Sequence, residues 1–350
     1  MKKTLVALAV AAMAATSANA FVIYEQDGSK VELGGSFRTF LGKVDDKHKR
    51  GDLINNGSRI GIKAAQDLGN GLSAVAGYEI RFEDGEQHFE QEGAKSNFGN
   101  PTTRKLFGGF KYDDVGTLTF GRQATNSDDV VQDAAYYRSG KYNPLTTDAD
   151  KSVKFRSAEW NGFSFGVDYL FGHSDKASVD DQYKNGYGVA AFYNYDIADD
   201  QKVEFAAAFN QNQYDLLVTS ETTKKDRKWV VHGSYTYGPV YFALNYGQTK
   251  TSNESPISSD EDKKGRYAMA DFRYQFSEPS AFFAQWERAD ERTRVKNKDD
   301  VIKNRYQVGL DYKFHKNVVA YAIYEQERKK DISGNTEKDH IYGTGLRVFF

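Results

Sequence analysis

The residue types that most often carry chemistry give little sign of a catalytic or metal site in this chain. His232 and Ser234 share one strand face but lie about 6.5 Å apart along it, and a nucleophilic serine needs its base within hydrogen-bond reach plus an orienting third group. The six histidines lack metal-ligand spacing and cysteine is absent. We therefore expect no enzyme, no metal and no cofactor, with a hydrolase as an open alternative.

Basic side chains are more informative, because several occupy the polar face of segments that alternate between apolar and polar residues. Arg38, for example, stands between Phe37 and Thr39, so it points to the opposite side from them. The cations placed on the polar face in this way are Arg38, Arg59, Lys154 and Arg156. Their shared parity suggests one charged inner surface.

The elements that position these cations are strands with a period of two. We count sixteen alternating segments between residues 31 and 350, each about ten residues long. Only five prolines but 31 glycines, 23 tyrosines and 24 phenylalanines suit many strands. No later stretch approaches the ~18 consecutive apolar residues of a transmembrane helix. The fold expected is all-β.

The connections between the segments alternate strictly between short and long. Short turns such as 69–71 and 238–239 alternate along the chain with long polar connections such as 123–151 and 251–264. A soluble sandwich has no reason to sort its loops, whereas a membrane barrel has short periplasmic turns and long extracellular loops. The pattern predicts a 16-stranded antiparallel transmembrane β-barrel.

The N-terminus has the three parts of an export signal. Lys2 and Lys3 precede an apolar stretch too short to span a bilayer, and a small-x-small pattern ends at Ala20. We expect cleavage after Ala20, with residues 1–20 the signal peptide and 21–350 the barrel. Removing two of 47 basic residues leaves 45 against 49 acidic ones, a net charge of about −4 that gives no hint of nucleic-acid binding.

Several blocks carry a family resemblance. Residues 24–33 (YEQDGSKVEL), 57–63 (GSRIGIK) and 103–122 (TRKLFGGFKYDDVGTLTFGR) resemble the general trimeric porins of Gram-negative bacteria, in particular the major porins of the Haemophilus and Pasteurella group. One departure is that the Pro-Glu-Phe-Gly stretch of enteric porins is replaced by Asn143-Pro144-Leu145 in the third loop. The final alternating face, which ends at Phe350, resembles the assembly signal of outer-membrane barrels.

The resemblance implies a general diffusion porin: a water-filled channel in the outer membrane for passive transport of small hydrophilic solutes and ions. It implies a homotrimer in contact with outer-membrane lipid, lipopolysaccharide and the outer-membrane assembly machinery, with the third loop, about residues 123–151, folded inward. A substrate-specific channel is the alternative. It would show an aromatic ladder on the inner face, and Phe40, Phe192 and Tyr241 are too scattered to make one.

The same resemblance assigns the candidate site, because porins select by pore width and by charges at the constriction. Arg104 matches a wall arginine of the family and joins Arg38, Arg59, Lys154 and Arg156 on a basic wall. The opposing acids are expected on the inward loop and are Asp128, Asp129 and Asp133, of which we favour Asp129 and Asp133.

Arg122 needs a separate account, since its parity puts it on the outer face, where an arginine facing lipid is costly. The resemblance suggests that a neighbouring subunit supplies the partner acid, Glu90 or Glu92 of the second loop. The alternative is an arginine at the strand end in the headgroup region.

Overall fold

The computed structural model describes residues 20–44, 50–82, 98–136, 139–174, 182–216, 222–253, 263–293 and 301–350. Strands dominate this part of the chain, and the one helical element in it is the 3-10 turn η1 (Asn126–Asp129). Over the same ranges, no helix has the length and apolar character needed to cross a membrane.

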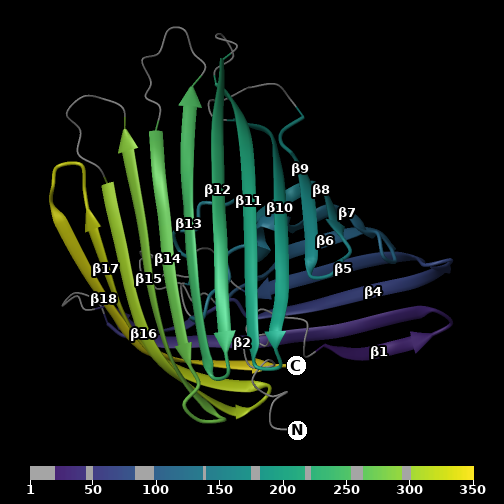
Figure 1. The fold of residues 1–350 in the computed structure, drawn as a ribbon, viewed down its shortest axis with the longest axis horizontal. Helices are drawn as coiled ribbons and strands as arrows, with labels where there is room; N and C mark the ends of the chain where they lie inside the picture. The colour runs from purple at the N-terminus through teal and green to yellow at the C-terminus, as the bar shows by residue number, and fades with distance from the viewer. Residues whose placement is uncertain are drawn as a thin grey trace.

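The strands form a single antiparallel sheet that closes on itself (Figure 1). They are β1 (Phe21–Gln26), β2 (Ser29–Val44), β3 (Asp52–Asn55), β4 (Arg59–Gly69), β5 (Leu72–Phe82), β6 (Pro101–Tyr112), β7 (Gly116–Ala124), β8 (Asp148–Ser157), β9 (Phe163–Phe171), β10 (Gln182–Ala198), β11 (Gln201–Leu216), β12 (Thr222–Tyr237), β13 (Val240–Asn253), β14 (Lys263–Tyr274), β15 (Ser280–Thr293), β16 (Val301–His315), β17 (Val318–Lys330) and β18 (Thr336–Phe349).

Sixteen of these strands make the ring, which closes where β18 pairs with β2. The predicted 16-stranded barrel is confirmed. The two remaining strands, which the sequence pattern did not predict, extend the wall beside β2: β1 pairs with 29–33 where β18 has ended, and β3 pairs with 39–42 above β4. The backbone of β2 is therefore hydrogen-bonded along most of its length.

Alternation along each strand produces two different faces. On β13, Phe242 and Leu244 are 43% and 53% exposed on the outside, whereas Tyr241, Ala243 and Asn245 are buried inside. The same outward display of aromatic and aliphatic side chains recurs on most other strands. So large an exposed apolar surface is unfavourable in water and suits lipid.

The tight turns contain residues that tolerate left-handed backbone. Between β4 and β5, Gly69, Asn70 and Gly71 all have positive φ, at 86°, 53° and 78°. Glycine adopts this region without a Cβ clash, and asparagine tolerates it better than most residues. The strand ends that lead into the longer connections lie at the opposite end of the barrel, as predicted.

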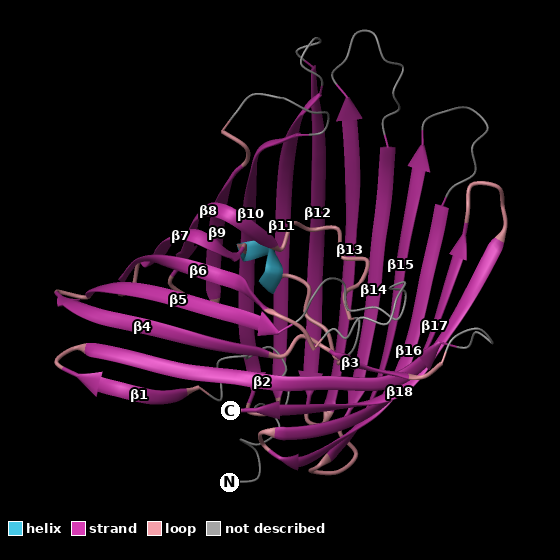
Figure 2. Ribbon diagram, turned by 180° about the vertical axis from the view of Figure 1, so that it is seen from behind, coloured by secondary structure: helices cyan, strands magenta, loops and turns pink. Residues whose placement is uncertain are grey.

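One long connection does not stay outside. The segment between β7 and β8, residues 125–147, turns into the barrel through η1, and Figure 2 shows η1 within the curve of the strands. Its Val130 and Leu145 pack with Phe192, Tyr267 and Met269 of the inner wall. The predicted inward fold of the third loop is confirmed, and we call this segment the inner loop.

Candidate functional site

A group of arginines lines the inner wall on β18, β2, β4 and β5. Arg38 of β2 is the direct cross-strand partner of Arg347 of β18, and Arg59 of β4 is the partner of Arg81 of β5. Arg38 donates from Nε to Ser36 Oγ at 2.8 Å, which holds its guanidinium against the wall. The predicted inward orientation of Arg38 and Arg59 therefore agrees with the structure.

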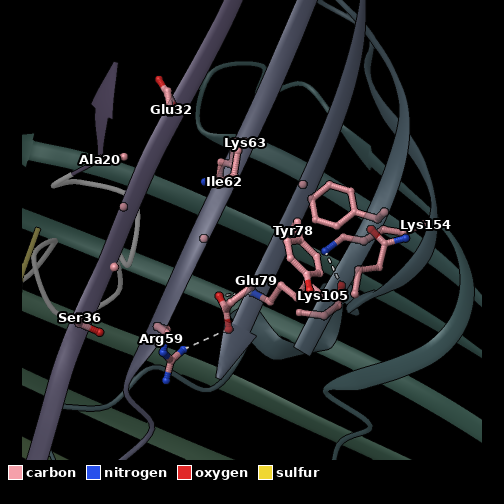
Figure 3. A pocket seen from close by; sticks show the side chains of 17 residues that line it. Ala20, Glu32, Ser36, Arg59, Ile62, Lys63, Tyr78, Glu79, Lys105 and Lys154 are labelled. Atoms are coloured by element: carbon pink, nitrogen blue, oxygen red, sulfur yellow. Dashed lines mark hydrogen bonds and ion pairs between the residues drawn. The ribbon is translucent and has the colours of Figure 1, made fainter. Parts of the chain in front are cut away.

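A single carboxylate stands at the centre of these cations. Glu79 Oε1 lies 3.3 Å from Arg81 Nε and 3.7 Å from Arg59 Nη1, and its Oε2 lies 3.8 Å from Lys105 Nζ. Figure 3 shows Arg59 and Glu79 pointing toward one another from neighbouring strands. Glu79 both reduces the repulsion between three like charges and lowers the net positive charge of the wall.

A cavity of about 250 Å³ lies along this wall, between β2 and β8. Its charged lining residues are Glu32, Arg59, Lys63, Glu79, Lys105 and Lys154. Four of these are basic and two acidic, so the surface that faces the open lumen is positive on balance. Such a surface attracts anions and repels cations that pass close to it.

Arg104 has a different position from the other predicted wall residues. A β-bulge on β6 leaves Glu79 opposite Lys105 and the next residue, Ile80, opposite Thr103, so Arg104 is the extra residue. Arg104 forms an ion pair with Asp148, at the point where the inner loop returns to β8. Arg104 thus anchors the base of the loop, and Lys105 occupies the wall position beside Glu79.

Lys154 and Arg156 both reach the lumen from β8. Lys154 Nζ donates to the carbonyl oxygen of Ala124 at 2.9 Å, close to the start of the inner loop. The Arg156 guanidinium lies 3.6 Å from the centre of the Phe192 ring and 3.4 Å from Asp129 Oδ2. Stacking on an aromatic face orients the guanidinium without neutralising its charge.

The three predicted loop acids lie in two different environments. Asp128 and Asp129 are exposed on η1, and Asp129 is the acid beside a wall arginine. Asp133 is half-buried deeper in the loop, where burial and the nearby Glu287 carboxylate raise its pKa to about 6, against the opposing effect of a hydrogen bond with Ser139. Asp129 therefore faces the basic wall, and Asp133 lies toward the covered side.

Hydrogen bonds fasten the base of the inner loop to β9 and β11. The Asn126 amide donates to the Asp168 carboxylate at 3.0 Å, and the Asn210 side chain donates to Ser127 Oγ at 2.9 Å. Asn210 Oδ1 accepts the Thr146 amide at 3.0 Å. Asn210 therefore joins both ends of the loop.

The far part of the loop is held by acids on β15 and β17. Glu327 accepts from Lys141 Nζ at 2.6 Å and from the Tyr142 hydroxyl at 2.5 Å. Glu287 accepts the Tyr142 amide at 2.9 Å. These charge-assisted bonds are roughly twice as strong as neutral ones, and they keep the loop against the wall.

Beneath this contact is a fully buried charge network. Arg305 of β16 is completely buried and forms ion pairs with Glu287 and, at 3.1 Å, with Glu325. It also donates to Gln285, whose amide donates to Ser139 Oγ of the loop at 2.7 Å. Arg305 orients the acceptors that hold the loop and does not face the open pore.

Tyr136 is the aromatic anchor of the loop. Its ring stacks on Tyr321 at 5.0 Å and meets Phe283 edge-on at 5.7 Å. The guanidinium groups of Arg347 and Arg273 lie 5.0 and 5.9 Å from its ring centre, and Arg347 donates to its carbonyl oxygen. The covered side of the lumen is thus filled with side chains, which leaves the open path along β2 to β8.

Sequence reasoning missed several of these residues, for two reasons. Glu79 and Arg81 have the opposite parity to the outward Tyr78. The alternation of this strand would therefore have been enough to predict that both side chains point inward. Lys105 had no such signal, because the bulge changes the parity of β6. The sequence also has no signal for the role of Arg305, because that role depends on which strands and which loop surround the side chain.

Arg122 lies on the outer face, as its parity predicted, and is exposed. Its Nη2 is 3.3 Å from Asp150 Oδ1 of the same chain, on β8. The predicted partners Glu90 and Glu92 lie outside the described residues. The outward arginine is therefore charge-paired within its own subunit.

The alternative catalytic pair is not assembled. His232 Nδ1 lies 2.9 Å from Asn245 Oδ1, and the Ser234 hydroxyl donates to Glu204 at 3.4 Å. Among the described residues, no group of three or more His, Cys, Asp or Glu side chains is arranged to hold a metal ion. The groups that converge in the lumen suit electrostatic selection.

Comparisons with known proteins agree with this architecture. A family model described as Gram-negative porin matches residues 5–332. The chain is 38% identical over 366 residues to the "Major outer membrane protein" of Pasteurella multocida strain Pm70 and 37% identical over 364 residues to a second protein of that name from Pasteurella multocida, with full coverage of both chains.

Solved structures share the fold at lower identity. In vitro folded OmpT of Vibrio cholerae superimposes with a TM-score of 0.72 at 19% identity, covering 94% of this chain and 99% of that one. An anion-selective porin from Comamonas acidovorans gives 0.70 at 16% identity, covering 92% and 100%. Salmonella typhi OmpF in complex with daunomycin gives 0.67 at 20% identity, covering 94% and 100%.

Proposed function

The chain belongs to the Gram-negative porin family, and from this premise we propose that it is a general diffusion porin whose narrowed lumen passes small hydrophilic solutes and ions. Its place is the outer membrane, and its activity is that of a channel rather than an enzyme. The porin function predicted from the sequence is confirmed by the family match and by the full-length relatives.

One observation carries the proposal: the inner loop lines one side of the barrel and leaves a charged, uncovered path along the other. The inner aromatic residues Phe192, Tyr267 and Tyr321 are buried against the loop. They are therefore unavailable as a ladder for sugars. A path lined by charges suits diffusion selected by size and charge.

We expect the channel to prefer anions. The cavity is lined by four basic and two acidic side chains, and Arg81 adds positive charge beside Glu79 on the same wall. Asp128 and Asp129 oppose this from the loop. The basic excess raises the local anion concentration in the narrow part of the lumen.

The proposed function is tested by inserting purified protein into a planar bilayer. We expect stepwise conductance that grows with salt concentration and a reversal potential on the anion side in a KCl gradient. Saturation of the current by one sugar at low concentration would support the substrate-specific alternative. Absence of conductance from folded, inserted protein would refute the porin function.

The partner and processing predictions extend this proposal. We propose a homotrimer that contacts outer-membrane lipid and lipopolysaccharide, with cleavage after Ala20 and with Phe350 recognised by the assembly machinery. Phe350 closes the barrel in the structure: its carbonyl oxygen accepts the Gly35 amide at 2.7 Å, and its amide donates to the Gly35 oxygen at 3.1 Å. A trimer form of Vibrio cholerae OmpT is among the similar structures.

Arg122 is proposed to contribute to the subunit interface through the acids of the second loop. Arg122→Ala should then lower the temperature at which the trimer dissociates, with little change in conductance. Heated samples on a denaturing gel measure the first quantity and bilayer recording the second. Asp150→Ala is the matched control, because it removes the partner within the subunit and leaves Arg122 for the neighbour. Equal trimer stability in Arg122→Ala and wild type would contradict the interface role.

A further inference from the structure

The first residue of η1 is fastened to the backbone of the barrel wall, and η1 as a whole packs against β8 to β11 (Figure 2). Asn126 is fully buried, and its backbone amide donates to the Asp168 carboxylate of β9 at 3.0 Å. Its side chain donates from Nδ2 to the Phe155 carbonyl oxygen of β8, also at 3.0 Å. Two adjacent strands therefore hold the same residue of the inner loop.

A glycine makes this close contact possible. Gly166 of β9 shares the inward parity of the buried Ser164 and Asp168. A Cβ at Gly166 would lie 2.5 Å from Asn126 Nδ2 and nearer still to Cγ and Oδ1 of the same side chain. A packed interior does not accommodate such an overlap. The Asn126 side chain therefore occupies the space that any other residue at position 166 would fill.

The neighbouring inward positions on β10 are small as well. A Cβ at Gly188 would lie 2.6 Å from Asn210 Nδ2. That group donates to Ser127 Oγ, in the second residue of η1. Ala190, two residues further along β10, belongs to the same buried apolar cluster as Val130, which directly follows η1. A floor of small residues thus lets η1 lie close to the backbone of the wall.

The distance of η1 from the wall decides what its acids meet. Asp129, three residues after Asn126, reaches Arg156 of β8 with 3.4 Å between Oδ2 and Nη1. Arg156 is the direct cross-strand partner of Gly166. The glycine beneath η1 and the arginine that meets its acid are therefore neighbours on the wall. A side chain at position 166 would push η1 outward from the wall and carry Asp129 away from Arg156.

We propose that Gly166 is a specificity-determining position of the channel. Its missing side chain sets how close η1 lies to the wall, and thereby whether Asp129 compensates the charge of Arg156. Gly166 acts through Asn126 and is a positioning residue, whereas the charged side chains act on the passing ions. This inference rests on the proposed channel function and adds to it the residue that fixes the charge balance beside the inner loop.

Gly166→Ala is the test variant, because the added methyl group must displace Asn126 and move η1 away from β9 into the lumen. We expect a lower single-channel conductance, since the inner loop then occupies more of the lumen. We also expect a reversal potential shifted toward anions in a KCl gradient, because Arg156 loses the acid that compensates it. Both are measured on purified protein in a planar bilayer near 0.1 M salt, where the Debye length is about 10 Å.

Asn126→Ala supplies the background that isolates the contact. It removes the side chain that fills the space over Gly166 and keeps the backbone amide that donates to Asp168. In this background, Gly166→Ala should change the conductance and the reversal potential far less than it does in wild type. Such non-additivity is the signature of two residues in contact.

Gly108→Ala is the matched control for replacing a strand glycine. Gly108 shares its outward parity on β6 with the exposed Leu106 and Phe110. A Cβ there would lie 3.5 Å from the nearest atom, the Val75 carbonyl oxygen, which is ordinary van der Waals contact. Conductance and reversal potential of this variant should equal those of wild type.

Two results would overturn the proposal: wild-type conductance and reversal potential in Gly166→Ala, or equal changes from this substitution in the wild-type and Asn126→Ala backgrounds. If Gly166→Ala alone does not fold, a folded and conducting Gly166→Ala/Asn126→Ala variant supports the contact. Failure of both to fold would contradict it, because the need for glycine would then not come from Asn126. Absence of conductance from the wild-type protein would refute the channel function instead.

Discussion

Arg305→Met is expected to loosen the inner loop and to destabilise the protein strongly. The side chain is fully buried and neutralises Glu287 and Glu325, both also fully buried. Removing one partner of a buried ion pair leaves uncompensated charge and typically costs ~3–5 kcal/mol. Here two carboxylates are left without their arginine, and Glu287 is the acceptor that holds the Tyr142 amide.

The measurable consequences are a lower unfolding temperature and a noisier channel. Without the arginine that orients its acceptors, the loop should leave the β15–β17 wall for part of the time, so single-channel records should show additional current levels. Lys303→Met is the matched control, because Lys303 lies on the same strand and face, two residues nearer the loop end. A stable Arg305→Met variant with one quiet current level would show that the inner loop holds its position without this network.

Arg59→Ala and Glu79→Gln are expected to move ion selectivity in opposite directions. The two side chains lie 3.7 Å apart on the wall of the same cavity, so each variant alters the charge at nearly the same point. Arg59→Ala should shift the reversal potential toward cations, and Glu79→Gln should shift it toward anions. A unit charge at 4 Å is worth roughly 4 kcal/mol at an effective dielectric near 20, an upper figure for a hydrated pore.

Salt dependence separates this electrostatic effect from a change in pore shape. The Debye length falls from about 10 Å at 0.1 M to about 3 Å at 1 M, so both shifts should shrink at high salt. Asp129→Asn on the loop should shift selectivity in the same direction as Glu79→Gln. Equal reversal potentials in wild type and both wall variants at low salt would place the selective constriction away from Glu79.

Local properties of the chain were readable from the sequence. Period-two alternation is a direct consequence of strand geometry, and it correctly placed Arg38 and Arg59 inside and Arg122 outside. Connection lengths separated the two ends of the barrel and singled out 123–151 as the unusual loop. The barrel was therefore predictable from the pattern alone, and the inward fold of that loop was predictable from the family resemblance.

Parity failed where the backbone departs from regular geometry. The bulge on β6 inserts Arg104 as an unpaired extra residue, sends it to Asp148 and brings Lys105 to Glu79. Nothing in the order of apolar and polar residues marks that insertion, because the strand has small and charged residues on both sides of it. β1 and β3 escaped prediction for a related reason: they are short pieces whose pairing depends on where β18 and β4 end.

Contacts between distant segments were decided by the tertiary structure alone. Asp129 and Asp133 are equivalent as loop carboxylates, and only the path of the loop brings one to Arg156 and the other to Ser139. In the sequence, Arg305 is one of several arginines with inward parity. In the structure it supports the loop, because it pairs with Glu287 of β15 and Glu325 of β17, and Glu287 accepts the Tyr142 amide. Alternation is set by each residue and its neighbours in the chain, whereas charge partners are set by the register of strands and the course of a loop far away in sequence.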